Sequence, residues 1–387
     1  MVINSVRAYA LTVLFEDIYG SLDRVPSYVS RPASHFQRFR RRGQQSTIVE
    51  ITTSDGLVGV GEAFGIPLAS VTTDLVNRII EPELMGVNPN DSEVVWDEFF
   101  HYFRALGHAR GPLMEALSAV DIAMWDLKGK AAGRPVCSLL GATVNSVRAY
   151  ASPVPFFDDA ADSAARALAY VRDGFDAVKL KIGRGLATDR EHIATVRSAL
   201  PDDTLLMLDV NGAYDVETAC ELARSLDPSA IAWLEEPVAP DDLHGLVRVK
   251  EVSSVPIAWG ENEFQATGFE IFISAGAVDV AQPNITRAGG ITGCTRIAAL
   301  CADRGVLFAP HGVGSAVGVT AALHVCAATP AFHYYEANRL DNPLRDELAP
   351  GALRFSAGAF HLNEQPGLGI ELDRHLLDRY RSVQIHG

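Results

Sequence analysis

The hydrophobic and polar positions of the chain change their period near residue 147. Beyond that point, short apolar runs alternate with longer stretches whose apolar positions recur at helical spacing. The apolar runs begin near residues 147, 176, 205, 230, 256, 278, 306 and 332. Eight repeats of strand and helix predict an α/β fold built on a parallel barrel, with function at the carboxyl ends of its strands.

Residues 1–130 follow a different pattern. An apolar, alternating stretch at the start of the chain is typical of a strand, and two alternating runs over 46–64 meet at Asp55-Gly56, a strong signal for a hairpin turn. Helical periodicity then covers 71–86, 92–106 and 112–133. Strands followed by helices predict an α+β capping domain.

We therefore expect three parts along the chain. A capping domain covers 1–130, a barrel covers 131–352, and a segment over 353–387, rich in turns and short strands, returns to the capping domain. The predicted fold is a modified (β/α)8 TIM barrel with a discontinuous α+β capping domain.

Two loops of the capping domain are candidates for a lid over the barrel mouth. The first covers about 16–45, and it holds tyrosines, a histidine and the run Arg40–Arg42. The second covers 64–68. For the run of arginines a solvated loop is the first interpretation. The alternative is a lid whose Arg, His or Tyr side chains contact the distal end of a substrate.

Charged side chains cluster at the ends of successive predicted strands. Alternate side chains of a strand share a face, so Lys179 and Lys181 of "AVKLKIG" project together. The same alternation brings Asp209 and Asn211 of "LMLDVNGAY" to one side. A lone pair of lysines is usually solvated, but here acidic strand ends follow in register.

Three consecutive strand ends carry a carboxylate. Asp209 is the first, "AWLEEP" supplies Glu235 and Glu236, and "PIAWGEN" supplies Glu261. Alternation separates Glu235 from Glu236, so we expect only one of them to face a shared centre. Each carboxylate alone is equally typical of a helix N-cap, whereas three in this order indicate a hard oxygen site for octahedral Mg²⁺.

Such a site suits one kind of reaction. A proton next to a carboxylate is weakly acidic, and a divalent cation on the carboxylate oxygens stabilises the charge that its removal creates. The base must be neutral, and we expect the neighbouring Lys179, a nearby metal ion and partial desolvation to lower the pKa of Lys181.

At this point the sequence resembles the enolase superfamily, and within it the mandelate racemase subgroup. The resemblance covers nearly the whole chain and is carried by "KLKIG", "LDVNGAY", "WLEEP", "GEN", "AGGITG", "APHG" and "PGLGIEL". It implies that Asp209, Glu235 and Glu261 bind one Mg²⁺ per subunit, with Mn²⁺ as an alternative.

The resemblance also implies roles for the other residues. Lys181 would be the base on one face of the substrate, and His311 would stand on the opposite face. Lys179 would contact the substrate carboxylate and tune Lys181, and Glu336 of "HYYEAN" would hydrogen-bond that carboxylate. The implied substrate-binding set is Lys179, Asn211, Asn284 and Glu336.

One position departs from the family pattern. Members that use histidine as a base orient it with an aspartate after the sixth barrel strand, where this chain has Asn284 in "AQPNITRAGG". An amide can fix a tautomer but cannot raise the basicity of imidazole by charge. His311 is therefore expected to act as a general acid, unless it is a core histidine with a structural role.

Charge and cysteine content narrow the partners. The net charge is −15 and no basic face runs along the chain, which argues against nucleic-acid or membrane partners. Five cysteines without metal-ligand spacing, and the absence of a signal-like N-terminus, indicate a cytoplasmic setting. We expect a small carboxylic acid as substrate and a homo-oligomeric assembly.

The function expected first is a lyase. It would dehydrate an acid sugar, an aldonate or aldarate, to a 2-keto-3-deoxy acid. A galactarolactone-type cycloisomerase and a racemase or epimerase are alternatives at the same site. A non-catalytic barrel that binds an acid is the alternative of another class.

Overall fold

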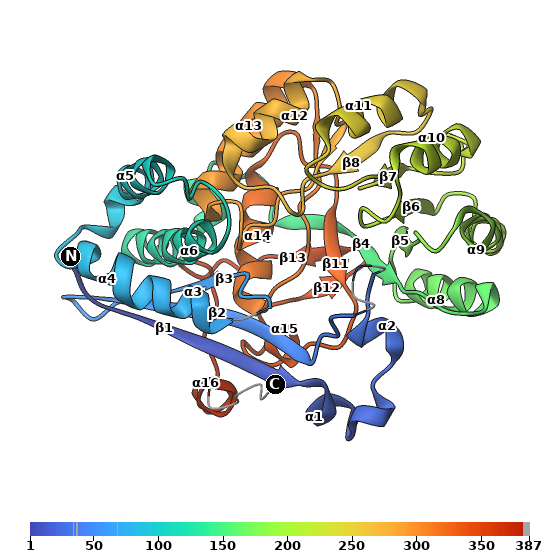
Figure 1. Cartoon of the computed structure of the whole chain (residues 1–387). Helices are drawn as coiled ribbons and strands as arrows, with labels where there is room; N and C mark the ends of the chain where they lie inside the picture. The colour runs from blue at the N-terminus through green and yellow to red at the C-terminus, as the bar shows by residue number, and fades with distance from the viewer. Residues whose placement is uncertain (34, 36–37, 68, 382–387) are drawn as a thin grey trace.

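The capping domain is built on a three-stranded antiparallel sheet. The computed structural model describes residues 1–33, 35, 38–67 and 69–381. Strands β1 (Ile3–Leu14), β2 (Gly43–Thr53) and β3 (Val58–Ala63) pair in that order (Figure 1). The predicted hairpin turn lies between β2 and β3, where Gly56 takes a left-handed φ of 87° that favours glycine.

Helices cover one face of this sheet. The three predicted helical stretches correspond to α3 (Ala69–Leu75) with its continuation through a π-helical turn (Val76–Ile80) to α4 (Glu81–Leu84), then α5 (Ser92–Ala105) and α6 (Pro112–Ala132). Helix α6 lies directly on β3. A Cβ atom at Gly61 would come within 1.9 Å of the Ala119 carbonyl oxygen, so glycine permits this close packing.

The first lid loop contains short helices that the sequence pattern did not predict. These are α1 (Phe15–Tyr19), the 3₁₀ turn Leu22–Arg24 and α2 (Ser27–Ser30). Tyr19 donates a hydrogen bond to Asp341 at 2.8 Å, and the ring of Tyr28 lies edge-on to Phe157 at 5.3 Å. Both tyrosines therefore fix the segment to the barrel. Of the second predicted loop, Leu68 lies outside the described residues.

Eight parallel strands form the barrel. Each begins within three residues of its predicted start, and β11 pairs with β4 while a bridge joins Phe308 to Phe332, which closes the ring. The strands are β4 (Ser146–Val154), β5 (Ala177–Lys181), β6 (Leu205–Asp209), β7 (Trp233–Glu235), β8 (Ile257–Trp259), β9 (Val280–Ala281), β10 (Leu307–Phe308) and β11 (Tyr335–Asn338).

Seven helices join these strands on the outside of the ring (Figure 1). They are α8 (Ala160–Arg172), α9 (Leu186–Ala199), α10 (Val216–Ser225), α11 (Leu243–Val252), α12 (Gln265–Ser274), α13 (Gly290–Arg304) and α14 (Ala316–Ala328). Large buried side chains, among them Tyr150, Met207, Trp233 and Tyr334, fill the interior of the ring. The ring is therefore a packed core, and the site must lie at its end.

The segment after residue 352 serves both parts of the molecule. Strands β12 (Phe355–Ser356) and β13 (Ala359–His361) first extend the barrel sheet, with β13 antiparallel to β4. Helix α16 (Arg374–Arg381) then packs on β1 of the capping domain, and Arg374 pairs with Glu50 of β2. Two short helices, α7 (Val136–Leu139) and α15 (Pro343–Asp346), lie in connections.

Buried carboxylates of the capping domain hold the barrel helices. Glu62 of β3 accepts hydrogen bonds from the backbone N–H groups of Ser315 and Gly318 at 2.7 and 2.6 Å, at the start of α14. Asp121 of α6 accepts from the backbone N–H of Thr292 at 2.8 Å, at the start of α13. A carboxylate at a helix N-terminus satisfies donors that the helix itself leaves unpaired. The two domains are therefore joined by buried polar contacts.

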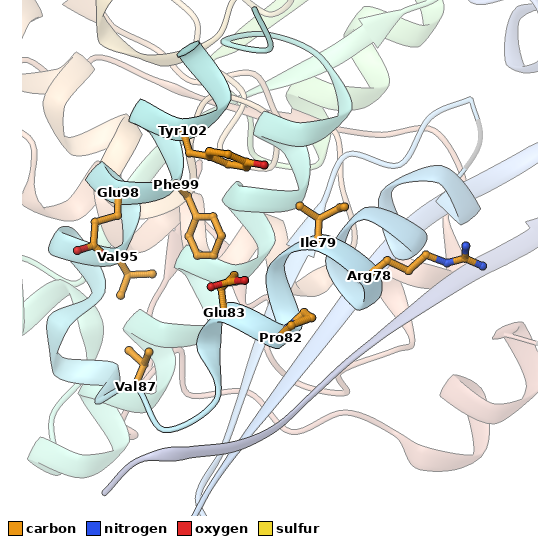
Figure 2. A pocket seen from close by; sticks show the side chains of 9 residues that line it. All are labelled: Arg78, Ile79, Pro82, Glu83, Val87, Val95, Glu98, Phe99 and Tyr102. Carbon is orange, nitrogen blue, oxygen red and sulfur yellow. The ribbon is translucent and has the colours of Figure 1, made fainter. Parts of the chain in front are cut away.

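A cavity of about 660 Å³ lies on the capping domain, away from the barrel mouth (Figure 2). Apolar side chains of α5 line one wall, and Ile79 and Pro82 face them.

The expected homo-oligomer stays a prediction, because the structure holds one chain. Among the described residues, no helix combines the length and the apolar character needed to cross a membrane.

Candidate active site

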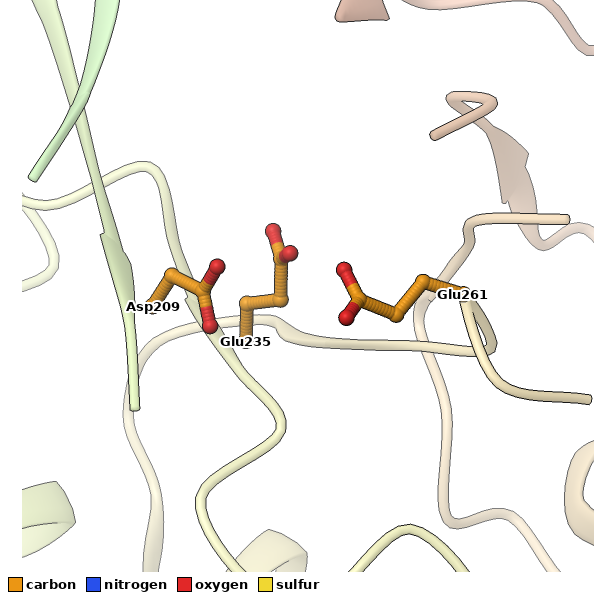
Figure 3. A group of neighbouring side chains, drawn as sticks. All are labelled: Asp209, Glu235 and Glu261. Atoms are coloured by element: carbon orange, nitrogen blue, oxygen red, sulfur yellow. The ribbon is translucent and has the colours of Figure 1, made fainter. Parts of the chain in front are cut away.

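Three carboxylates from neighbouring strands converge at the barrel mouth (Figure 3). Parallel pairing sets Lys181 beside Asp209 and Asp209 beside Glu235, so the ends of β5, β6 and β7 are in register. Glu261 follows β8 by two residues. One oxygen from each of Asp209, Glu235 and Glu261 lies within 4.8 Å of the others.

This arrangement fits a divalent cation. Two oxygens bound to one Mg²⁺ at about 2.1 Å are about 3.0 Å apart when adjacent and about 4.2 Å apart when opposite, so the three carboxylates would draw together when they bind the ion. Burial and the charge of Asp209 raise the pKa of Glu235. Carboxylates in a buried cluster repel one another, and a hard cation bound among them compensates this repulsion.

The two lysines face this cluster, as the strand alternation predicted. Lys179 is fully buried and lies 2.6 Å from Glu235, 3.0 Å from Glu336 and 3.5 Å from Asp209. Lys181 pairs with Asp209 and donates to Asn211 Oδ1 at 2.6 Å. Lys181 is the more accessible of the two, with 13% of its side chain exposed, and it lines the cavity at the barrel mouth.

Without a cation among the carboxylates, the pKa of Lys181 is raised. Burial lowers it, but the carboxylate of Asp209 outweighs burial and the neighbouring Lys179, and the pKa lies above its ordinary value. The expectation of a lowered pKa includes a metal ion that offsets these carboxylates, so it stays a prediction. In this arrangement Lys181 becomes a base only when the charge of Asp209 is taken up by another cation.

Glu236 lies near these carboxylates but is not one of the three that converge, in agreement with the expectation that only one of Glu235 and Glu236 faces the shared centre. Strand β7 ends at Glu235, and Glu236 takes a left-handed φ of 38° that re-aims its side chain. Asn262 Nδ2 lies 3.4 Å from both oxygens of Glu236. Burial, and then the charges of Glu261 and Asp209, raise the pKa of Glu236 well above its usual value.

His311 stands beyond the opposite end of the row of ligands. It follows β10, whereas Lys181 ends β5, and β6 to β9 lie between them in the sheet. His311 Nε2 lies 3.2 Å from Glu261 and 3.9 Å from Glu336. A Cβ atom at the next residue, Gly312, would lie 1.7 Å from the Glu336 carbonyl oxygen, so glycine lets this loop approach β11.

The contacts of Asn284 define the tautomer of His311. The backbone N–H and the hydroxyl of Thr286 both donate to Asn284 Oδ1, at 3.0 and 2.6 Å. A backbone N–H can only donate, so Oδ1 must lie on that side and Nδ2 must face His311 Nδ1, 2.9 Å away. Nδ1 therefore accepts, and the neutral imidazole carries its proton on Nε2, toward the cavity.

Glu336 of β11 lies on the same side of the mouth. Burial opposes ionisation, but Lys179 and then His311 outweigh it and lower the pKa of Glu336 below its usual range. The carboxylate accepts from the backbone N–H of Gly312 at 3.2 Å. In this arrangement Glu336 is an acceptor, so it needs a proton before it can donate a hydrogen bond to a substrate carboxylate.

A cavity of about 600 Å³ opens above these groups. Lys181, Asn211, Glu261, His311 and Glu336 line its barrel end. Both lid loops contribute to the other wall, including His35, Phe39, Arg40, Arg41, Arg42, Phe64, Ile66 and Pro67. The lid stays a prediction, and the tyrosines of the first loop are not among the residues that line the cavity.

The cysteines do not contribute to this site. All five are buried and unpaired, and burial raises the pKa of the Cys301 thiol to about 12.

Gln282 was missed by the sequence analysis, although its amide donates to Glu235 at 2.6 Å. A glutamine in a short apolar run gives no signal of its own.

Family models match both parts of the chain. The model described as "Mandelate racemase / muconate lactonizing enzyme, N-terminal domain" matches residues 25–141, and the one described as "Enolase C-terminal domain-like" matches residues 161–376. Together they cover more than half of the chain and agree with a capping domain followed by a barrel.

Characterised relatives and solved structures agree with these models. The chain is 36% identical to a D-galactarolactone cycloisomerase of Agrobacterium fabrum, over 89% of this chain and 93% of the relative. It is 32% identical to an L-talarate/galactarate dehydratase of Salmonella typhimurium, over 84% and 80%.

Two crystal structures show the same architecture. The 3,6-anhydro-D-galactonate cycloisomerase of Zobellia galactanivorans aligns with a TM-score of 0.85 at 32% identity, covering 98% of this chain and 99% of that one. A Streptomyces coelicolor racemase with bound magnesium aligns with a TM-score of 0.86 at 28% identity, covering 98% and 99%. Family models, relatives and structures thus converge, and the chain belongs to the mandelate racemase subgroup of the enolase superfamily and is an enzyme.

Proposed function

We propose that this enzyme removes the proton α to the carboxylate of an acid sugar and expels a β-hydroxyl as water. The observation that carries the proposal is the pairing of an amine and an Nε2–H imidazole at opposite ends of a row of three carboxylates. An amine on one side and a proton donor on the other suit an elimination better than two equivalent bases.

Lys181 acts as the base in this proposal. Its neutral amine takes the α-proton, and the electron pair of the broken C–H bond moves into the substrate carboxylate to form an enediolate. Lys179 faces the carboxylate end of the substrate, where its positive charge stabilises the oxygens on which charge develops. Asn211 holds the Lys181 amine through the hydrogen bond at 2.6 Å.

His311 completes the elimination as the general acid. The enediolate electron pair returns to form a C=C bond, the β C–O bond breaks, and the proton on His311 Nε2 passes to the leaving oxygen, which departs as water. The resulting enol tautomerises to a 2-keto-3-deoxy acid. Asn284 acts through His311 as a positioning residue, because its amide keeps Nδ1 unprotonated.

Asp209, Glu235 and Glu261 would hold a Mg²⁺ ion, with Mn²⁺ as an alternative. When bound, such an ion supplies Lewis-acid stabilisation of the substrate carboxylate. Magnesium in a structural neighbour and the convergent oxygen donors support this choice. Asp209 would then no longer hold Lys181 as an ammonium ion, which removes the largest opposing influence on its pKa.

A cycloisomerase is the second candidate, and the 36% identity to a galactarolactone cycloisomerase favours it. Lys181 would remove the same α-proton, and the ring oxygen on the β-carbon would leave as the carboxylate of the opened lactone, with His311 placed to protonate it. A racemase or epimerase requires His311 to act as a base, which its Nε2–H tautomer disfavours.

The test is a substrate panel in deuterated water. Purified enzyme with Mg²⁺ is mixed with aldonic acids, aldaric acids and their lactones, and α-proton exchange and products are followed by NMR. A keto-deoxy acid formed from an open-chain acid with loss of water supports the dehydratase, and a keto-deoxy acid formed from a lactone by ring opening without loss of water supports the cycloisomerase. Inverting exchange alone would refute both. Full activity in Lys181→Ala would show that the base is assigned wrongly.

A further inference from the structure

The cavity at the barrel mouth has a cationic wall that the proposed chemistry does not use. Its barrel end holds the reacting groups, whereas Arg40, Arg41 and Arg42 line the lid end. The backbone fixes this run: the N–H of Arg41 donates to the Ser30 carbonyl oxygen at 2.9 Å, and the carbonyl oxygen of Arg42 accepts from Phe15 at 2.9 Å. The arginines are thus held at the cavity by backbone hydrogen bonds to α1 and α2 of the first lid loop.

Two of these arginines have no acidic partner in the part of the chain that the structure describes. Among the described residues, neither Arg40 nor Arg41 forms an ion pair with an aspartate or glutamate. The side chain of Arg41 donates to the neutral Gln44 at 2.8 Å, and burial lowers its pKa to about 10. A desolvated guanidinium without an acid is unfavourable unless a ligand supplies the charge.

Another arginine of the same cavity shows the contrast. Arg287 lies 3.2 Å from Glu115, donates to Asn262 at 2.7 Å and stacks on Phe64 with 3.8 Å to the ring centroid. Its charge is matched inside the protein and its position is structural. The chain has 48 acidic and 33 basic residues, so acids for pairing are plentiful, yet none reaches Arg40 or Arg41 among the described residues.

We infer that Arg40 and Arg41 bind a second carboxylate of the substrate, at the end opposite the carboxylate that lies among Lys179 and the three metal-ligand candidates. The inference rests on the proposed function, and it narrows the substrate class to aldaric acids and their monolactones, with aldonic acids excluded as preferred substrates. Arginine suits this task because its planar fork meets both oxygens of a carboxylate.

The experiment compares matched acids. The ratio of kcat/KM is measured for a six-carbon aldarate and for the aldonate of the same configuration, in which a hydroxymethyl group replaces the distal carboxylate. Wild-type enzyme is compared with Arg40→Met and Arg41→Met. Arg38→Met is the control, because Arg38 lies in the same loop, is exposed and is absent from the cavity lining.

The expected result is a wild-type preference for the aldarate. Hydrogen bonds to a charged group contribute about 1.5–3 kcal/mol, so each substitution at Arg40 or Arg41 should reduce the preference by about 10- to 150-fold. Arg38→Met should keep the wild-type ratio. Since Arg41 is partly buried, Arg40→Met and Arg41→Lys serve as the variants least disruptive to folding.

Three results would overturn the inference. They are a wild-type preference for the aldonate, an equal effect of the Arg40 and Arg41 substitutions on both acids, and a preference for an aldonate with a terminal phosphate, which would make the distal group a phosphate. Calorimetric binding of both acids to Lys181→Ala with Mg²⁺ separates this inference from the proposed reaction. If the aldarate binds more tightly than the aldonate, and this preference depends on Arg40 and Arg41, the distal carboxylate site is supported. If wild-type enzyme then shows no α-proton exchange, the proposed reaction is refuted although the site remains.

Discussion

Replacing Asn284 by aspartate should switch the tautomer of His311. In the native protein Thr286 holds Asn284 Oδ1, so the amide NH₂ faces His311 Nδ1. In Asn284→Asp, one carboxylate oxygen can keep the Thr286 contacts while the other accepts a hydrogen bond. Nδ1 should then carry a proton, and Nε2 gains the ability to accept one.

The size of the native preference follows from these contacts. An Nδ1–H tautomer would place two donors against each other, which loses one hydrogen bond worth about 0.5–1.5 kcal/mol and leaves a buried donor unpaired at about 1–3 kcal/mol. The sum is about 1.5–4.5 kcal/mol, so fewer than about one neutral molecule in ten should carry the proton on Nδ1. In the variant, a charge-assisted bond of about 1.5–3 kcal/mol reverses the preference.

The assay is ¹⁵N NMR of histidine-labelled protein, with the His311 signal identified by its loss in His311→Gln. Wild-type protein should show a protonated Nε2 and an unprotonated Nδ1, and Asn284→Asp should show a protonated Nδ1. Inverting α-proton exchange should also appear in the variant, because His311 can then accept a proton. Thr286→Val is the control: its backbone N–H still orients the amide, so the native tautomer should persist.

A protonated Nδ1 in neutral wild-type His311 would refute this reasoning. It would mean that Asn284 presents its oxygen to the imidazole, and the argument for a general acid would lose its structural basis.

Other parts of the structure lead to three further predictions. Asp209→Asn should lower Mg²⁺ affinity measured by calorimetry by at least tenfold, since it removes a charged oxygen ligand, and unchanged affinity would exclude Asp209 as a ligand. Glu62→Gln should lower the free energy of unfolding by about 2–4 kcal/mol in denaturant titrations, because an amide cannot accept on both sides from the start of α14. His324 is buried and its pKa is lowered to about 4. Because unfolded His324 binds a proton that the folded protein rejects, its contribution is present above about pH 6.5 and should be lost by about 3 kcal/mol as the pH falls from 6.5 to 4. The slope of stability against pH in this range should flatten in His324→Asn, and an unchanged slope would exclude His324 as its source.

The barrel could be predicted because its signals are local. Strand starts, the alternation of Lys179 with Lys181, and the convergence of Asp209, Glu235 and Glu261 all follow from period-2 patterns at the ends of parallel strands. These features can be predicted from the order of residues along the chain alone. The family model of the barrel and the register of β5 to β7 agree with them.

The misses come from effects that act between distant residues. The left-handed φ of Glu236, which interrupts the strand geometry directly after β7, has no signal in the residue types. The direction in which the pKa of Lys181 shifts without a metal depends on a carboxylate from the next strand. The orientation of the Asn284 amide depends on Thr286 and could not be read from residue types alone.

The buried carboxylates that join the two domains also bear on how the protein unfolds. Glu62 and Asp121 are almost fully enclosed, and their acceptor oxygens are satisfied by groups of the barrel. Separating the domains would leave these charges and the first N–H groups of α13 and α14 without partners, which is unfavourable for any half-folded species. Two family models match two parts of the chain, but we expect these parts to unfold together in a single cooperative transition. Local opening should be confined to the loops that carry the arginines.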